Sequence, residues 1–197
     1  MQEINTIHFT QIEKKNNQYN IVNLYSDNER IYLNLPKLHC PFGITKYVNN
    51  GKEKYSLNVS ITEEQHPEIF NFIENVDDLV TDNFLENKSW LDTLEQPLNS
   101  SRKDIEQFGN KLINKQENHP AYINLKLIFD NTQQFYCNIS KCDKDGKYTQ
   151  LRTTDDIKSI LYKKIYIKSQ IVVSNVWIMK DKYGITLKPK KIVFYEN

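Results

Sequence analysis

The stretch Lys54-Tyr-Ser-Leu-Asn-Val-Ser-Ile61 decides how the chain is organised, because it alternates apolar and polar residues and a different period follows at once. Strict alternation is typical of a half-buried β-strand. From residue 62 onward, apolar side chains recur every three or four positions between Ile69 and Phe84. This spacing predicts an amphipathic helix of about five turns, which contains Pro67 and is capped by Thr62. The chain therefore passes from β-structure to helix at about residue 62.

Further alternating segments lie on both sides of this helix. Before it, we expect strands over 4–10, 19–25 and 30–35, and turns at 41–43 and 49–51. Asn50-Gly51 is the strongest hairpin signal in the chain. After the helix, strands are expected over 121–129, 134–139, 147–151, 164–174, 176–179, 183–187 and 192–195.

Three shorter helical segments are also expected. Trp90 lies in a short helical turn, and Ser101 opens a second helix that includes Leu112 and Ile113 and stops before His119-Pro120. Thr154 begins a short helix nearer the C-terminus. The pattern predicts one mainly β, α+β domain over residues 1–197. Its β-part is expected to be an antiparallel barrel or strongly bent sheet, with a helical insertion at about 62–118.

The composition favours a folded, intracellular protein. Hydrophobic residues make up 39% of the 197 residues and aromatic residues 12%, a larger aromatic share than a disordered chain carries. We expect no membrane helix and no signal peptide, because no run approaches about 18 apolar residues and the first residues are polar. The three cysteines, Cys40, Cys137 and Cys142, cannot all pair with one another, which indicates a reducing compartment.

Charge is unevenly distributed along the chain although the net charge is only +1. Residues 1–60 hold 7 basic and 5 acidic residues, residues 61–120 hold 5 and 13, and residues 121–197 hold 14 and 7. Two basic outer segments around an acidic middle fit a polyanion that the outer segments bind and the middle avoids. The alternative is that lysines solvate strands and acids solvate helices.

Motifs for catalysis, metals and cofactors are absent from the sequence. There is no phosphate-binding glycine loop, no nucleophile elbow and no His-Glu-x-x-His pair, and the four histidines are isolated. Asp143-Lys-Asp-Gly146 predicts a hairpin turn rather than a calcium loop, and Asp77, Asp78 and Asp82 predict a solvated helix face. We therefore expect no enzyme, no metal and no cofactor. A nuclease stays a third alternative, which requires carboxylates distant in sequence to converge on a metal.

Lysine interleaved with aromatic residues is the pattern that points to a function. It occurs at Lys46-Tyr47, Lys52-Glu-Lys54-Tyr55, Tyr162-Lys-Lys-Ile-Tyr166 and Lys180-Asp-Lys-Tyr183. Single-stranded nucleic acid needs this pair, because cations follow the phosphates and rings stack on the bases. For any one pair, a buried ring beside a solvated lysine is the competing explanation.

Leu35-Pro-Lys-Leu-His-Cys-Pro-Phe-Gly-Ile44 followed by Lys54-Tyr-Ser-Leu-Asn-Val-Ser60 resembles a block in a protein family of the nucleocytoplasmic large DNA viruses. That family continues with a tryptophan-bearing helical stretch, a proline before a Leu-Lys-Leu strand, and a closing hairpin with a tryptophan. The matching positions here are Trp90, Pro120 with 125–127, and 176–195. The order and spacing hold over nearly the whole chain, with a weak match over 145–170.

This family looks like the OB-fold single-stranded DNA-binding proteins. The resemblance implies an OB-like barrel that binds single-stranded DNA, in preference to RNA, with little sequence preference during viral DNA replication, recombination or repair. It implies no catalytic residue. The implied partners are the strand itself, viral replication proteins and further copies of the chain, without a membrane. The implied location is the host cytoplasm, in a viral factory, or the nucleus, with packaging in the virion as a further option.

Nine residues are the candidates for contact with the strand. An OB barrel binds across its second and third strands, which fall within residues 30–61. Lysines there and in the later lysine-rich run are expected on phosphates, and rings in or beside turns are expected to stack. The set is Lys37, Phe42, Lys46, Tyr47, Lys52, Lys54, Lys163, Lys164 and Tyr166. The alternative function is a structural or scaffolding module of a large DNA virus, with the helical insertion as its interface.

Overall fold

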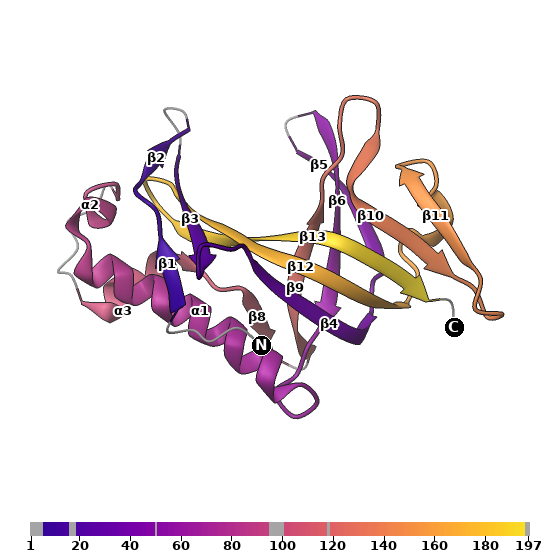
Figure 1. Ribbon diagram of the computed structural model, residues 1–197, viewed down its shortest axis with the longest axis horizontal. Coiled ribbons are helices and arrows are strands. Elements are labelled where there is room, and N and C mark those ends of the chain that lie inside the picture. The colour runs from indigo at the N-terminus through magenta and orange to yellow at the C-terminus, as the bar shows by residue number, and fades with distance from the viewer. Residues whose placement is uncertain (1–5, 16–18, 50, 95–100, 118, 196–197) are drawn as a thin grey trace. The chain divides into compact units, whose positions relative to one another are not determined.

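The computed structural model describes residues 6–15, 19–49, 51–94, 101–117 and 119–195 (Figure 1). The protein is a mainly β, α+β protein with 54% strand and 20% helix, so the expected fold class is confirmed at this level. Its strands form a nine-stranded sheet and a four-stranded sheet, and no closed barrel is found within the described ranges. The chain divides into two compact units.

The first unit comprises Met1–Ile31, Pro67–Ile113 and Val173–Thr186. Its elements are β1 (Ile7–Phe9), β2 (Glu13–Lys14), β3 (Asn20–Ser26), α1 (Pro67–Glu86), α2 (Lys88–Leu91), α3 (Arg102–Phe108), β7 (Gly109–Asn110), the end of β12 (Ile165–Ile178) and the start of β13 (Tyr183–Tyr195). The apolar stripe of α1 is buried, and Phe84 contacts both Trp90 and Tyr183 with ring centroids 5.1 and 4.4 Å apart. These rings form the aromatic part of the core of this unit.

The long helix and the turn at Trp90 are confirmed with small differences in their ends. Thr62 accepts hydrogen bonds from Gln65 and His66 in a preceding turn, and α1 itself begins at Pro67. Proline suits the first helical position because its missing N–H would have no partner there. Asn87 caps α2, which contains the expected Trp90.

The second expected helix is shorter than the sequence pattern indicated. Ser101 caps α3 as expected, but α3 ends at Phe108, and Gly109 begins the short strand β7. Leu112 therefore lies beyond the helix, and its backbone N–H donates to the buried Asp77 carboxylate at 2.8 Å. The apolar spacing that suggested a continuous helix belongs instead to two different elements, because Ile113 begins β8 (Ile113–Gln116).

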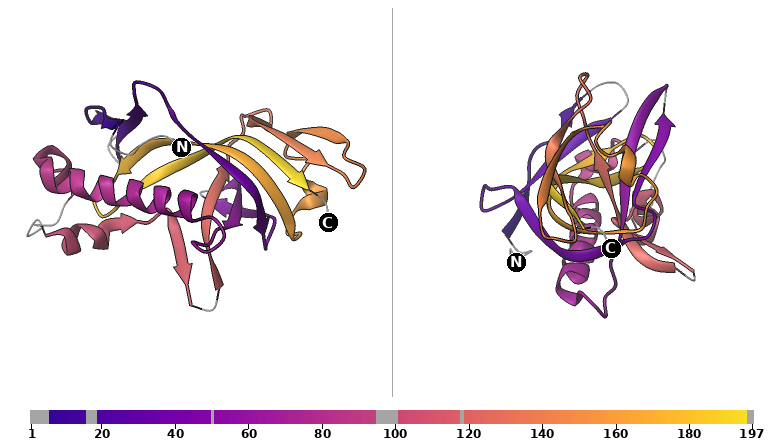
Figure 2. Two further views of the ribbon diagram at one scale, coloured as in Figure 1. Left: turned by 60° about the horizontal axis from the view of Figure 1, so that its bottom comes forward. Right: turned by 90° about the vertical axis from the view of Figure 1, so that its right-hand side faces the viewer.

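The second unit comprises Tyr32–His66, Asn114–Val172 and Leu187–Asn197. Its elements are β4 (Ile31–Cys40), β5 (Ile44–Asn49), β6 (Lys52–Ser60), β8, β9 (His119–Leu127), β10 (Gln134–Cys142), β11 (Tyr148–Thr153), a 3-10 helix (Lys158–Ile160) and the remaining parts of β12 and β13. The four-stranded sheet has the order β5-β6-β9-β8. Figure 2 shows the long strands β12 and β13 side by side, as neighbours in the nine-stranded sheet.

Strand direction and strand bounds differ from the expectations in three ways. The nine-stranded sheet is mixed, since β10 and β7 both run parallel to β13, so the expectation of a purely antiparallel arrangement is wrong there. β5 was not expected as a strand. The segments expected separately at 164–174 and 176–179 form β12, and those expected at 183–187 and 192–195 form β13.

The β5–β6 hairpin occurs where Asn50-Gly51 predicted one. β5 and β6 pair antiparallel from Ile44↔Leu57 to Asn49↔Lys52, and Gly51 has a φ of +72°, while Asn50 lies outside the described residues. One face of the four-stranded sheet is apolar, with Leu57, Leu125 and Leu127 buried. The opposite face carries polar side chains, and we call it the polar face of the sheet.

The turn before β5 packs tightly against the segment that leads into β12. Gly43 has a φ of +58°, and a Cβ at this position would lie 2.1 Å from the backbone oxygen of Lys163. Next to it, Tyr162 donates its backbone N–H to Ile44 at 2.9 Å, and its hydroxyl bonds both the backbone N–H and the backbone oxygen of Lys46. The outer edge of β5 is therefore hydrogen-bonded along these residues.

Candidate nucleic-acid interface

Charge separates between the two compact units. The first unit contains 9 basic and 15 acidic residues, and the second contains 17 basic and 10 acidic residues. Their net charges are therefore −6 and +7. All nine sequence-predicted residues belong to the second, basic unit. A polyanion would be attracted to this unit and repelled by the other.

The strands of the basic unit are almost free of carboxylates. β4, β5, β6 and β8 to β13 carry twelve lysine and arginine residues and one acidic residue, Glu53. The other acidic residues of this unit that the structure describes lie in loops and turns. The basic residues on these strands are Lys37, Lys46, Lys52, Lys54, Lys115, Lys126, Lys141, Arg152, Lys168, Lys188, Lys190 and Lys191.

The β5–β6 hairpin separates the predicted residues onto two faces. Tyr47 lies directly opposite Lys54, on the polar face, and Lys52 follows on the same face. Lys46 lies opposite Tyr55, on the other face. Lys46 therefore lies on the face opposite to Lys52 and Lys54, because adjacent residues of a strand point to opposite faces.

Lys46 is also neutralised locally. Its ammonium forms an ion pair with Glu53, and the Tyr55 hydroxyl donates to the same carboxylate at 3.0 Å. These hydrogen bonds, from Lys46 first, lower the pKa of Glu53, and the bond to Glu53 raises the pKa of Lys46. A lysine held in such an ion pair binds a phosphate more weakly than a lysine without a partner does.

Lys126 extends the polar face and was missed from the sequence. Ser56 on β6 pairs with Lys126 on β9, so Lys126 lies diagonally next to Lys54 on the same face. Diagonal neighbours across an antiparallel pair are about 7–8 Å apart. The alternation of Leu125-Lys-Leu127 is the signal that could have placed Lys126 at an exposed position, but the sequence could not show that β9 pairs with β6.

A second group of predicted residues lies on β4 and β12. The Lys37 ammonium is 5.2 Å from the centroid of the Tyr166 ring and 4.8 Å from that of Tyr195. The His39 ring also contacts Tyr166, with ring centroids 5.2 Å apart. A cation–π contact thus joins Lys37 and Tyr166, two of the nine candidate residues. His39 and Tyr195 were not predicted, because their approach depends on the pairing of strands.

The remaining predicted residues lie at the tight turn around Gly43. Phe42 is 56% exposed beside it, the largest exposure among the three predicted rings. The backbone of Lys163 lies against Gly43, and Lys163 and Lys164 are both exposed. The structure therefore brings Phe42 near the lysine-rich run, as a site that combines rings and cations requires.

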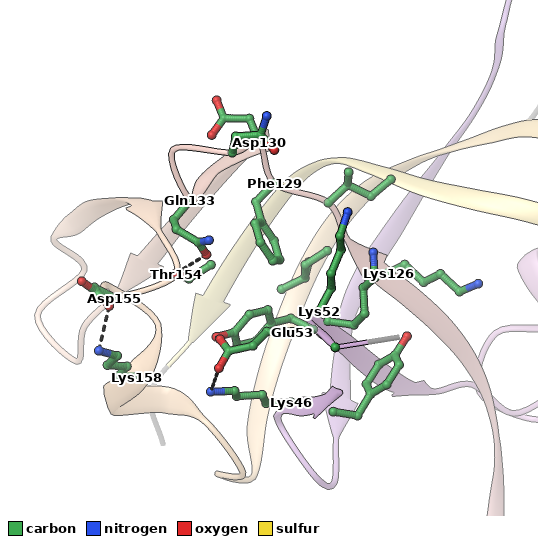
Figure 3. A pocket seen from close by; sticks show the side chains of 17 residues that line it. Lys46, Lys52, Glu53, Lys126, Phe129, Asp130, Gln133, Thr154, Asp155 and Lys158 are labelled. Atoms are coloured by element: carbon green, nitrogen blue, oxygen red, sulfur yellow. Dashed lines mark hydrogen bonds and ion pairs between the residues drawn. The ribbon is translucent and has the colours of Figure 1, made fainter. Parts of the chain in front are cut away.

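A cleft opens where two hairpins diverge. The last pair between β6 and β9 is Tyr55↔Leu127, and beyond it β6 pairs with β5 while β9 turns into β10. The space between them, with Thr154, Asp155 and Lys158 as a further wall, has a volume of about 920 Å³. We call it the hairpin cleft (Figure 3). Phe129 points into it and contacts Tyr55 at 5.6 Å between ring centroids.

Nucleophiles and metal ligands do not gather at any of these places. Within the described ranges, no cluster of three histidine, cysteine or acidic residues could hold a metal ion. The three cysteines are unpaired and buried, and burial raises the pKa of Cys40 to about 12 and that of Cys137 to about 11. Both are thiols rather than reactive thiolates at neutral pH.

Comparison with known proteins found no match, since neither a family model nor a curated protein is similar to this chain. Among the helices that the structure describes, none is long and apolar enough to cross a membrane.

Proposed function

We propose that the protein binds single-stranded nucleic acid, DNA in preference to RNA, through the polar face of the four-stranded sheet and with little sequence preference. The observation that carries this proposal is the pairing of exposed Tyr47 with Lys54, beside Lys52 and Lys126, on strands where Glu53 is the one carboxylate. Rings for stacking and cations for phosphates are the two requirements of such binding.

The same nucleic-acid strand would make further contacts at two places. They are the cluster of Lys37, Tyr166 and Tyr195 and the turn at Phe42. Together with Lys163 and Lys164 they supply the same two chemical groups elsewhere on the basic unit. An OB-like bent sheet is part of the proposal, in which the consecutive, paired strands β5 and β6 would be the strand pair across which OB folds bind.

The wider role follows from the resemblance to the viral family. It consists of viral DNA replication, recombination or repair in an infected cell, with viral replication proteins and further copies of the chain as partners. A scaffolding module remains the alternative. It gains no support from the segment that would be its interface, because the described residues of 62–118 expose no large hydrophobic side chain.

An oligo(dT) titration at low and high salt tests the proposal. Binding should weaken steeply as salt rises, because each phosphate that a lysine neutralises releases a counterion. Folded protein that fails to bind oligo(dT) at low salt would contradict the proposal. An RNA oligonucleotide of the same length tests the preference for DNA, which would be wrong if RNA bound more tightly.

A further inference from the structure

The hairpin cleft holds more positive charge than its own carboxylates neutralise. Five lysines and three acidic residues line it. Two of the lysines are held in ion pairs, Lys46 by Glu53 and Lys158 by Asp155, as the dashed lines in Figure 3 show. The other three have no ion pair among the described residues, and they are Lys52, Lys54 and Lys126.

The third carboxylate of the cleft, Asp130, is occupied by its own loop. Its Oδ1 accepts hydrogen bonds from the backbone N–H of Thr132 at 2.8 Å, from the Thr132 hydroxyl at 2.6 Å and from the backbone N–H of Gln134 at 3.0 Å. These bonds, from the hydroxyl first, lower the pKa of Asp130. Asp130 thus serves to shape the β9–β10 turn.

The unpaired lysines come from both hairpins and lie on one face. Lys52 and Lys54 belong to β6, and Lys126 lies diagonally next to Lys54 on β9. The cleft also has an aromatic wall at the point of divergence, formed by Tyr55 and Phe129. Its volume of about 920 Å³ is within the range of pockets that enclose small ligands. It therefore offers a ligand several cations, with the half-buried Phe129 ring pointing into the same space (Figure 3).

We propose that the hairpin cleft binds a phosphomonoester, namely the terminal phosphate of a nucleic-acid strand. This inference rests on the proposed function and deepens it. A phosphomonoester carries about −1.5 to −2 charges at pH 7, whereas each phosphodiester within a strand carries one. Three ammonium groups that form no ion pair with any described residue match the higher charge. The Phe129 ring, which points into the cleft (Figure 3), lies beside the place where such a strand would end.

The test compares three internally labelled oligo(dT) strands of equal length, with a 5′-phosphate, a 3′-phosphate or no terminal phosphate. We expect one phosphorylated strand to bind about tenfold more tightly than the unphosphorylated strand, the size of one further charge-assisted hydrogen bond. The preference should shrink as the pH falls from about 7.5 to about 5.5, because a phosphomonoester takes up a proton near pH 6. No histidine lines the cleft among the described residues.

Variants connect the preference to the cleft. Lys126→Gln and Lys54→Gln should each reduce the preference for the phosphorylated strand, and both residues are exposed, so the fold should tolerate them. Lys144→Gln is the matched control, because it removes an equal charge from the exposed turn between β10 and β11 and lies outside the cleft. A control that loses the preference equally would overturn the assignment to the cleft.

The remaining outcomes separate this inference from the proposed function. Equal affinity for all three strands would overturn the terminal-phosphate inference and leave single-strand binding standing. Binding of thymidine monophosphate or inorganic phosphate, without binding of any oligonucleotide, would overturn both and assign the cleft to a free ligand.

Discussion

Tyr47 on β5 lies directly opposite Lys54 on β6, so that a ring and an ammonium group share the polar face of the four-stranded sheet. Residues in this relationship have Cβ atoms about 4.5–5.5 Å apart. Lys46, one residue earlier, lies on the other face with Glu53 and Tyr55. A single nucleic-acid strand that crossed the polar face would contact Tyr47 and Lys54 together. Lys46 would contribute little to its binding.

Replacing Lys52 and Lys54 by alanine should weaken binding of all single-stranded sequences alike. If each lysine neutralises one phosphate, the slope of log affinity against log salt should flatten by about 0.7 per lysine, as for other single strands. Titrations of oligo(dT) and oligo(dA) at several salt concentrations would measure both quantities. Wild-type affinity and slope in this variant would show that the polar face is the wrong surface.

Replacing Tyr47 by alanine should weaken binding with a different signature. Loss of one stacked base costs about 1–3 kcal/mol and involves no counterion, so the salt slope should stay nearly unchanged. Lys46→Ala is the control from the adjacent position, and its effect on affinity should be smaller because Lys46 is already paired with Glu53. A larger loss from Lys46→Ala than from Tyr47→Ala would reverse this assignment.

Gly43→Ala should destabilise the protein by about 2–4 kcal/mol, since the new Cβ meets a backbone atom and the residue has a left-handed conformation. Gly146→Ala is a matched control. Gly146 also has a positive φ, of +81°, but nothing lies within 4 Å of the added Cβ, so the expected cost is about 1 kcal/mol. Urea unfolding of the two variants measures the difference, and equal costs would contradict the tight packing of Gly43 on Lys163.

Asp77 should make the free energy of unfolding fall as the pH rises from about 4 to about 7. Burial raises the pKa of this carboxyl to about 7, against the partial opposition of the Leu112 hydrogen bond. The native state then binds more protons than the unfolded chain over this range, so stability is lost as the pH passes through the native value. Asp77→Asn retains an oxygen that accepts from Leu112 and removes the ionisation.

The Asp77→Asn variant should therefore flatten the pH dependence by about 2–4 kcal/mol between pH 4 and pH 8. Urea unfolding at both pH values gives this quantity. Asp92→Asn is the control, because Asp92 is an exposed carboxylate of the same unit. If Asp77→Asn and the wild type show the same pH dependence, the carboxyl is not protonated in the native state.

Local signals in the sequence predicted much of the fold. Alternation and helical spacing depend on neighbours a few residues apart, so α1, the turn at Trp90 and most strands were predicted close to their observed bounds. The failures have a physical reason. Leu112 and Ile113 continue the apolar spacing of α3, but Leu112 bonds to Asp77, a residue 35 positions earlier. Parallel pairing of β10 with β13 likewise depends on distant segments.

The candidate site could be predicted in its residue types and not in its arrangement. Lysines interleaved with rings are visible in the sequence, and alternation within a strand already separates Lys46 from Tyr47. What the sequence lacks is the register between strands, which places Lys126 next to Lys54 and Tyr195 next to Lys37. The hairpin cleft exists because β6 and β9 stop pairing at Tyr55, and no local pattern encodes that position.

The phenol of Tyr162 has a consequence for how the protein behaves at high concentration. β5 is the outermost strand of its sheet, and exposed backbone groups on an outermost strand can recruit a strand from another molecule. The Tyr162 hydroxyl bonds the backbone N–H and oxygen of Lys46, and the Tyr162 N–H bonds the backbone oxygen of Ile44, so these groups do not pair with a strand from another molecule. Tyr162→Phe removes the hydroxyl and so frees the backbone N–H and oxygen of Lys46. We expect this variant to aggregate through the edge of β5.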